Sequence, residues 1–269
     1  MVQLSLVIVL LVGAVVGSRA QNTVLRDTLR GEFPSVVNVK TPRVDQECLG
    51  VVINANHVLT AAFCVINDAG THIFATRLVR VLAGDIVLAP ATITRQVRDV
   101  SHIFVHENYR PHLFENNLAV IRLHAPFHLP SNAIEPVYIR NRIVADNSEC
   151  DIVRWLRPVA GQPPPATPEI PRQQALNAYV LNRDACGTTR RVQESMICMR
   201  PSTANYPTIQ GDLMFCDREL VGVMSFYFTD PQQQTQPNLV FTQVRFHTHW
   251  IHNQLNRTQP MPPGWNPLE

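Results

Sequence analysis

The segment Leu59-Thr60-Ala61-Ala62-Phe63-Cys64 lies among short β-branched runs that turn residues separate from one another. No pattern with a helical period interrupts these runs before Gln243–Leu255, which is predicted to be a terminal helix. Many short strands followed by one late helix indicate antiparallel barrels or sandwiches. The runs span residues 35–40, 51–53, 78–82, 103–106, 118–123, 220–228 and 239–244.

The composition limits how many domains the chain can form and which classes of partner it favours. The chain has 269 residues, 45% of them apolar, which is enough for one large domain or two packed halves. A formal net charge of +2 gives no strong electrostatic field. The charge therefore does not point to nucleic acid or to a membrane surface.

The first residues indicate secretion. The apolar run Leu4–Val16 is too short to anchor the chain across a bilayer, and it ends in the small-x-small pattern Ser18-Arg19-Ala20. Residues 1–20 are therefore predicted to be a signal peptide. In an oxidising compartment the six cysteines should pair, although their spacing alone does not choose among the connectivities. Asn256-Arg257-Thr258 is an N-glycosylation sequon on the expected C-terminal surface.

Proline content sets two further boundaries. Pro158–Pro171 contains six prolines, so it is expected to be a linker or a long surface loop rather than a central strand or helix. Residues 258–269 are expected to form a proline-rich tail. The main domain is then predicted to span residues 21–257.

The segment Leu59–Cys64 resembles the Leu-Thr-Ala-Ala-His-Cys segment of the trypsin-like serine protease family. Other strings similar to that family follow in the family's order, and the match covers about residues 30 to 255. The resemblance implies an all-β fold of two packed antiparallel six-stranded barrels with a C-terminal α-helix. The other similar strings are Gly31–Pro34, Ile103–Tyr109, Asn117–Ile121, Met196–Cys198, Gln210–Asp212, Val221–Phe226, Val240–Val244 and Trp250–Ile251.

The resemblance also implies how the cysteines pair. It leaves no cysteine free, and the chain has no Cys-x-x-Cys spacing that would favour a metal site. No metal and no cofactor is expected. The implied pairs are Cys48–Cys64, Cys150–Cys216 and Cys186–Cys198.

Three departures from the family pattern predict that catalysis is lost. Acyl transfer on this fold needs a serine nucleophile, a histidine base and an orienting aspartate. Phe63 stands in place of the histidine and Asn117 in place of the aspartate. After Asp212 the family's serine and the following glycines are missing, which also shortens the turn that would form an oxyanion hole.

The substrate pocket and the activation step are also predicted to be altered. Pro207 stands at the position that makes the family's specificity pocket acidic, while Tyr227 and Leu239 replace pocket-wall glycines and are expected to occlude it. The chain lacks an Ile-Val-Gly-Gly start, so Asp212 is expected to lack a new amino terminus as its ion-pair partner. Activation by cleavage is therefore not expected.

Several histidines and one serine have side chains that could act in catalysis or bind a metal, but each is interpreted as structural. His57 is interpreted as a strand residue rather than a relocated base, and Ser225 as a structural serine without a base. His249 and His252 share a helical face that His247 does not, so a solvated face is favoured over a metal site.

The resulting hypothesis is a secreted, catalytically inactive serine protease homologue. It would act as an adaptor, cofactor or decoy and bind extracellular proteins, such as proteases or other components of proteolytic cascades in immunity or haemostasis. Neither nucleic acid binding nor membrane insertion is expected. One alternative is a protein that binds heparin or another sulfated glycan, or is antimicrobial, through the arginine pairs 140/142, 190/191 and 95/98. Another is a hydrolase with non-standard residues.

Overall fold

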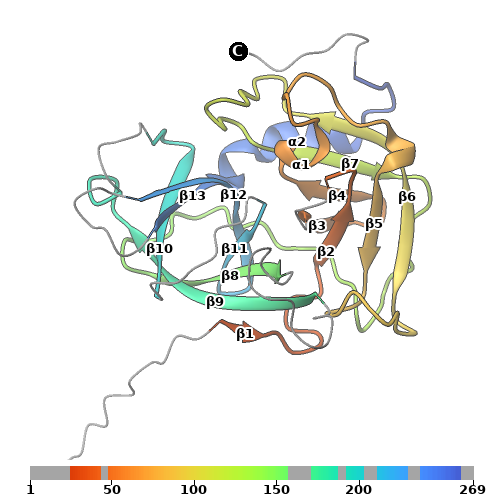
Figure 1. The fold of residues 1–269 in the computed structure, drawn as a ribbon, viewed down its shortest axis with the longest axis horizontal. Coiled ribbons are helices and arrows are strands. Elements are labelled where there is room, and N and C mark those ends of the chain that lie inside the picture. Colours follow the sequence, from red (N-terminus) through yellow and green to blue (C-terminus); the bar gives the residue numbers. More distant parts are fainter. Residues whose placement is uncertain are drawn as a thin grey trace, which may run out of the picture.

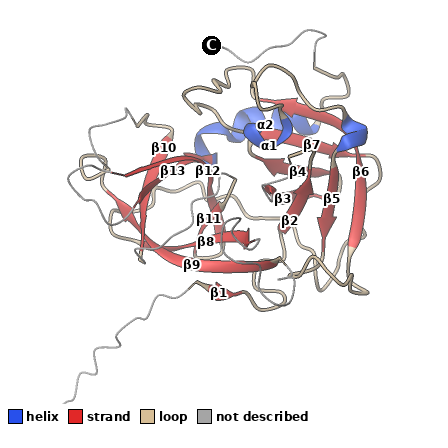
Figure 2. Ribbon diagram, in the orientation of Figure 1, coloured by secondary structure: helices blue, strands red, loops and turns tan. Residues whose placement is uncertain are grey.

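The computed structural model describes residues 25–43, 48–156, 171–186, 192–202, 211–229 and 237–261. Two β-barrels lie side by side, and the two α-helices lie near the junction between them (Figure 1). Strands dominate both halves (Figure 2). The expected all-β fold of two six-stranded antiparallel barrels is confirmed. The predicted signal peptide lies outside the described residues, as does most of the predicted linker or loop at Pro158–Pro171.

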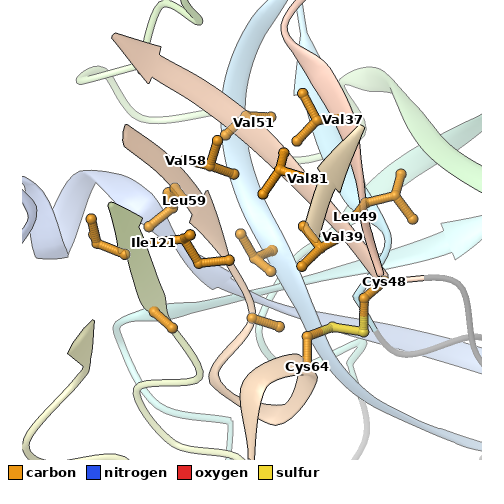
Figure 3. Close-up of a cluster of buried hydrophobic side chains, with 14 of the residues drawn as sticks. Val37, Val39, Cys48, Leu49, Val51, Val58, Leu59, Cys64, Val81 and Ile121 are labelled. Carbon is orange, nitrogen blue, oxygen red and sulfur yellow. A yellow bond between two sulfur atoms is a disulfide. The ribbon is translucent and has the colours of Figure 1, made fainter. Parts of the chain in front are cut away.

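The first barrel is built from the N-terminal strands. Its strands are β2 (Val36–Lys40), β3 (Cys48–Asn54), β4 (His57–Thr60), β5 (Arg80–Ala83), β6 (Gln96–Val105) and β7 (Ala119–Leu123), in the closed order β2-β3-β4-β7-β6-β5. Short β-branched and leucine side chains fill its interior, as Figure 3 shows. Between β4 and β5 lie a single helical turn, α1 (Ala62–Val65), and the 3-10 turn η1 (Thr76–Leu78).

The second barrel is built from β8 (Glu149–Leu156), β9 (Arg172–Leu181), β10 (Met196–Pro201), β11 (Leu213–Cys216), β12 (Glu219–Thr229) and β13 (Pro237–Gln243). The sheet runs β9-β10-β13-β12-β11-β8, and the pairing of β8 with β9 closes it. The short strand β1 (Arg26–Asp27) adds to β9. Phe33 and Phe215, whose ring centroids are 5.2 Å apart, belong to a buried apolar cluster with residues from both barrels.

The structure contains the three disulfides that the resemblance implies. They join Cys48 to Cys64, Cys150 to Cys216, and Cys186 to Cys198. Figure 3 shows the first of them joining the start of β3 to α1.

The C-terminal helix starts later than the sequence predicts. Gln243 is the last residue of β13, and the 3-10 turn η2 (Val244–His247) precedes α2 (Thr248–Leu255). The expected helix from Gln243 was therefore wrong at its N-terminal end, because the first residues of the periodic pattern finish a strand and a tighter turn. In the described ranges, no helix has the length and apolar character needed to cross a bilayer.

A buried histidine pair helps to dock α2 on the first barrel. The rings of His106 and His247 are 5.1 Å apart, and Trp250 packs 4.7 Å from His106. The Trp250 indole donates a hydrogen bond to Glu107, at 2.6 Å. Burial, reinforced by the neighbouring His106, lowers the pKa of His247 to about 4.

This arrangement predicts that stability falls as the pH drops. The unfolded chain takes up the His247 proton near the ordinary pKa of about 6.5, whereas the folded protein resists protonation down to about 4. The contribution of neutral His247 is therefore complete above pH ~6.5 and is lost progressively between pH ~6.5 and ~4, to a total of up to about 3 kcal/mol. Urea unfolding across this range should show a smaller loss in His247→Phe than in the wild type, because His57 and His106, whose pKa values burial also lowers, contribute a loss in both proteins.

His252→Phe is the matched control, because His252 is an exposed histidine of α2, the helix that directly follows His247. Its pH profile should follow the wild type. Identical profiles for the wild type and His247→Phe would contradict the assignment.

Candidate functional site

Phe63 is the central side chain of the candidate site. It lies on α1, the turn that directly follows β4 and that the Cys48–Cys64 bridge ties to β3. The Arg43 guanidinium stacks over the Phe63 ring, with Cζ 3.9 Å from the centroid. Arg43 also donates hydrogen bonds to the Phe63 and Ile66 carbonyls, at 3.1 and 2.9 Å. A phenyl ring held in this way can neither accept nor return a proton.

Asn117 is fully buried and connects the two barrels. Its Oδ1 accepts the backbone N–H of Phe63 at 2.9 Å, and its Nδ2 donates to the carbonyl of Met224 on β12 at 3.3 Å. The amide thus uses both of its ends on backbone groups. It holds α1 against β12, and it carries no charge that could stabilise an imidazolium ion.

The chain enters β11 directly after Asp212. Leu213, the first residue of β11, pairs with Val223 on β12 and with Val153 on β8. A strand with a neighbour on each edge uses its N–H groups in the two ladders. These amides are therefore not available as a pair of donors for an oxyanion.

Gly211 makes the bend before this strand. Its φ is +93°, in the region that favours glycine, and a Cβ there would lie 3.2 Å from the Cys64 Sγ. The bend therefore lies directly against α1 and the Cys48–Cys64 bridge.

Asp212 has an ion-pair partner that the sequence analysis missed. Its Oδ2 lies 3.6 Å from Nη2 of Arg154 on β8, and both side chains are completely buried. The available signal was an arginine in the otherwise apolar run Ile152–Leu156 of a predicted barrel domain. A buried arginine of this kind needs an anionic partner.

The predicted pocket residues are only partly within the described structure. Tyr227 is 47% exposed, whereas its register partner Leu239 is fully buried in the second barrel. Ser225 is buried and its hydroxyl lies 2.8 Å from that of Thr242. Pro207 falls outside the described residues, so occlusion of the pocket by these side chains stays a prediction.

An aromatic row formed by Phe63, Phe114, Phe226 and Phe228 crosses from the first barrel to the second. Successive ring centroids are 6.2, 6.3 and 6.4 Å apart. Phe114 has a φ of +53°, which is unusual for a phenylalanine and brings its ring between Phe63 and Phe226. Sequence analysis missed this row, because its members are distant in sequence and meet only where the barrels pack.

The histidines and serines of the described chain do not form a nucleophile–base pair with anion donors. His57 is buried on β4, its Nδ1 lies 2.9 Å from Asn54 Oδ1, and burial lowers its pKa. Ser101 lies 3.2 Å from His102 Nδ1, but its hydroxyl donates to backbone carbonyls of β7. Carbonyls beside a serine would repel an oxyanion rather than stabilise it.

The C-terminal histidines do not converge. His247 is buried against His106, while His249 and His252 are exposed on α2. Within the described ranges, no group of three or more potential ligands is placed to hold a metal ion. Asn256, the sequon residue, is exposed at the end of α2.

The arginine pairs that were considered for glycan binding have partners within the protein. Arg140 and Arg142 pair with Asp217 and Glu219. Arg95 pairs with Asp85, and Arg98 donates to the carbonyl of Pro126. The pair 190/191 lies outside the described residues.

Comparison with known proteins gives one consistent result. The model of the trypsin family matches residues 24–251. The chain is 27% identical over 220 residues to kallikrein 1-related peptidase b27 of Mus musculus, covering 76% of this chain and 78% of the relative. It is 30% identical over 201 residues to the serine protease SP24D of Anopheles gambiae, covering 73% and 68%.

A solved structure has the same fold. Neuropsin, a serine protease expressed in the limbic system of mouse brain, superposes with a TM-score of 0.69 at 21% identity. The match covers 86% of this chain and 99% of neuropsin.

Proposed function

Because the chain belongs to the trypsin family, we propose that it is a secreted, catalytically inactive homologue of these proteases that works as a binding or regulatory protein. Its partners are extracellular proteins, such as proteases or other components of proteolytic cascades. The proposed process, in immunity or haemostasis, rests on analogy with the family.

One observation carries the proposal of inactivity: β11 begins at Leu213, immediately after Asp212, and is paired on both edges. The family's serine belongs in this interval, and the amides that follow it would form the oxyanion hole. Loss of one oxyanion donor costs roughly 3–4 kcal/mol of transition-state stabilisation. Loss of the nucleophile or the base alone lowers kcat by roughly 10⁶-fold.

Phe63 and Asn117 support the same proposal from the first barrel. An aromatic side chain with a guanidinium stacked on it replaces the base. The neutral amide of Asn117 takes the place of the orienting carboxylate and is engaged by the Phe63 N–H and the Met224 carbonyl. Restoring any one of these groups would leave the others missing.

Secretion is supported by the N-terminal sequence and by the cysteines. The apolar run Leu4–Val16 followed by Ser18-Arg19-Ala20 is typical of a signal peptide. All three cysteine pairs form disulfides, which persist in oxidising compartments.

The aromatic row supports a binding role for the surface that Phe63, Phe114, Phe226 and Phe228 form between the two barrels, which we call the cleft. Phe114 and Phe228 are both partly exposed, and they belong to different barrels. β11 pairs with β12 only as far as Val223. The last residues of β12, Phe226–Thr229, lie beyond that point and pair with β13. Exposed aromatic side chains are common anchors at protein interfaces. The arginines of the two described pairs, 95/98 and 140/142, are engaged with carboxylates and a carbonyl, which makes them poorer ligands for a sulfated glycan.

Purified protein should not hydrolyse peptides. We expect a mass-spectrometric screen of a peptide library to find no cleavage above the blank for either the wild type or Phe63→His, while an active trypsin cleaves in the same buffer. The restored histidine should not help, because the serine and the oxyanion amides are still missing. Cleavage that co-purifies with the wild-type protein would revive the hydrolase alternative.

The aromatic row should be needed for partner capture. Tagged protein incubated with the native extracellular fluid should retain specific proteins, and Phe228→Ser should reduce their recovery at least about tenfold, as expected for an interface anchor. Phe246→Ser is the matched control, because Phe246 is an exposed phenylalanine outside the row. Equal recovery with both variants would show that the row is not the binding surface.

A further inference from the structure

Arg154 and Asp212 meet because of strand register. β8 and β11 pair in antiparallel fashion, with Leu213 opposite Val153. Continuing this register by one residue places Asp212 opposite Arg154, and their charged groups lie 3.6 Å apart with both side chains fully buried. The ion pair is thus formed by neighbouring strands of one continuous chain.

A carboxylate buried at this depth needs a counter-charge. An isolated ionised group inside a protein is strongly disfavoured, and a paired one is tolerated when its partner is held nearby. In the family that this chain resembles, the aspartate at this position pairs with an amino terminus created by cleavage. A guanidinium is always protonated, so Arg154 can supply the positive charge without any cleavage.

We infer that Arg154 replaces the new amino terminus as the partner of Asp212, so that the wall of the cleft reaches its final conformation in the uncleaved protein. The inference deepens the proposed function, since it concerns the wall of the proposed binding cleft. The ion pair itself does not depend on the loss of catalysis.

Backbone hydrogen bonds connect the ion pair to the cleft. The Asp212 carbonyl accepts the N–H of Met224 on β12, at 2.8 Å. The Met224 carbonyl in turn accepts from Asn117 Nδ2, at 3.3 Å. Two residues further along β12 is Phe226, a member of the aromatic row. A displacement of Asp212 would therefore also shift β12 and the aromatic row.

The first described strand is held away from Asp212. Arg26 of β1 pairs with Ala175 of β9, and Ala175 pairs with Val153 of β8, which is opposite Leu213. The strands in this row follow the order β1, β9, β8, β11. Two strands, β9 and β8, thus lie between β1 and β11.

The test compares single and double variants of the uncleaved protein. Arg154→Met and Asp212→Asn should each lower Tm by roughly 10 °C, because each leaves one buried charge without its partner. Amide hydrogen exchange in Gly211–Met224 should become faster in both. The double variant should be more stable than either single variant, since it leaves neither charge unpaired. Arg142→Met, at a mostly exposed arginine, should change Tm by less than about 2 °C.

A second measurement leaves Arg154 and Asp212 unaltered, so its outcome does not depend on whether the variants fold. A short N-terminal extension on the mature protein should change neither Tm nor the exchange of Gly211–Met224. If the extension lowered Tm as Asp212→Asn does, the amino terminus would be the partner and the inference would be wrong. The inference would also be wrong if Arg154→Met changed neither Tm nor exchange. Neither result depends on peptide hydrolysis, which the library screen reports separately.

Discussion

The pairing of β11 with β8 on one edge and β12 on the other is the constraint on which the cleft depends. Because Leu213 is opposite both Val153 and Val223, the chain has no free residues between Asp212 and the strand. The same register places the Asp212 carboxylate opposite Arg154. The direct entry of the chain into β11 after Asp212 and the buried ion pair are therefore two consequences of one strand alignment. Because both side chains are fully buried, each charge is stabilised by the other.

The residues that the resemblance aligns with the family's catalytic positions make structural contacts in this chain. Asn117 joins the N–H of Phe63 in the first barrel to the carbonyl of Met224 in the second. Met224 is also bonded through its N–H to Asp212. A chain of hydrogen bonds thus crosses the barrel interface, and buried polar groups without partners would destabilise it. This requirement favours the observed arrangement of the two barrels at the site.

Much of the architecture could be predicted from sequence, because the short β-branched runs and the ordered family-like strings of residues are local signals. Arg154 was given no role from the sequence, although it stands in the otherwise apolar run Ile152–Leu156, because Asp212 is distant in the chain and becomes its neighbour only through strand pairing. Its role emerges only from the register with β11. The aromatic row was missed for a similar reason, since Phe63 and Phe226 approach one another only through barrel packing. The helix start was displaced because the periodic pattern from Gln243 also fits the end of β13 and a 3-10 turn.

Reaction with a fluorophosphonate is the sharpest test of whether the cleft holds an activated nucleophile, which we propose that it lacks. Such a reagent phosphonylates a serine, with loss of fluoride, only where a base and an oxyanion site are both present. The intact mass of the purified protein should stay unchanged after prolonged incubation, under conditions in which an active trypsin is fully modified. A stoichiometric increase by the mass of the adduct, located on a single serine, would contradict it.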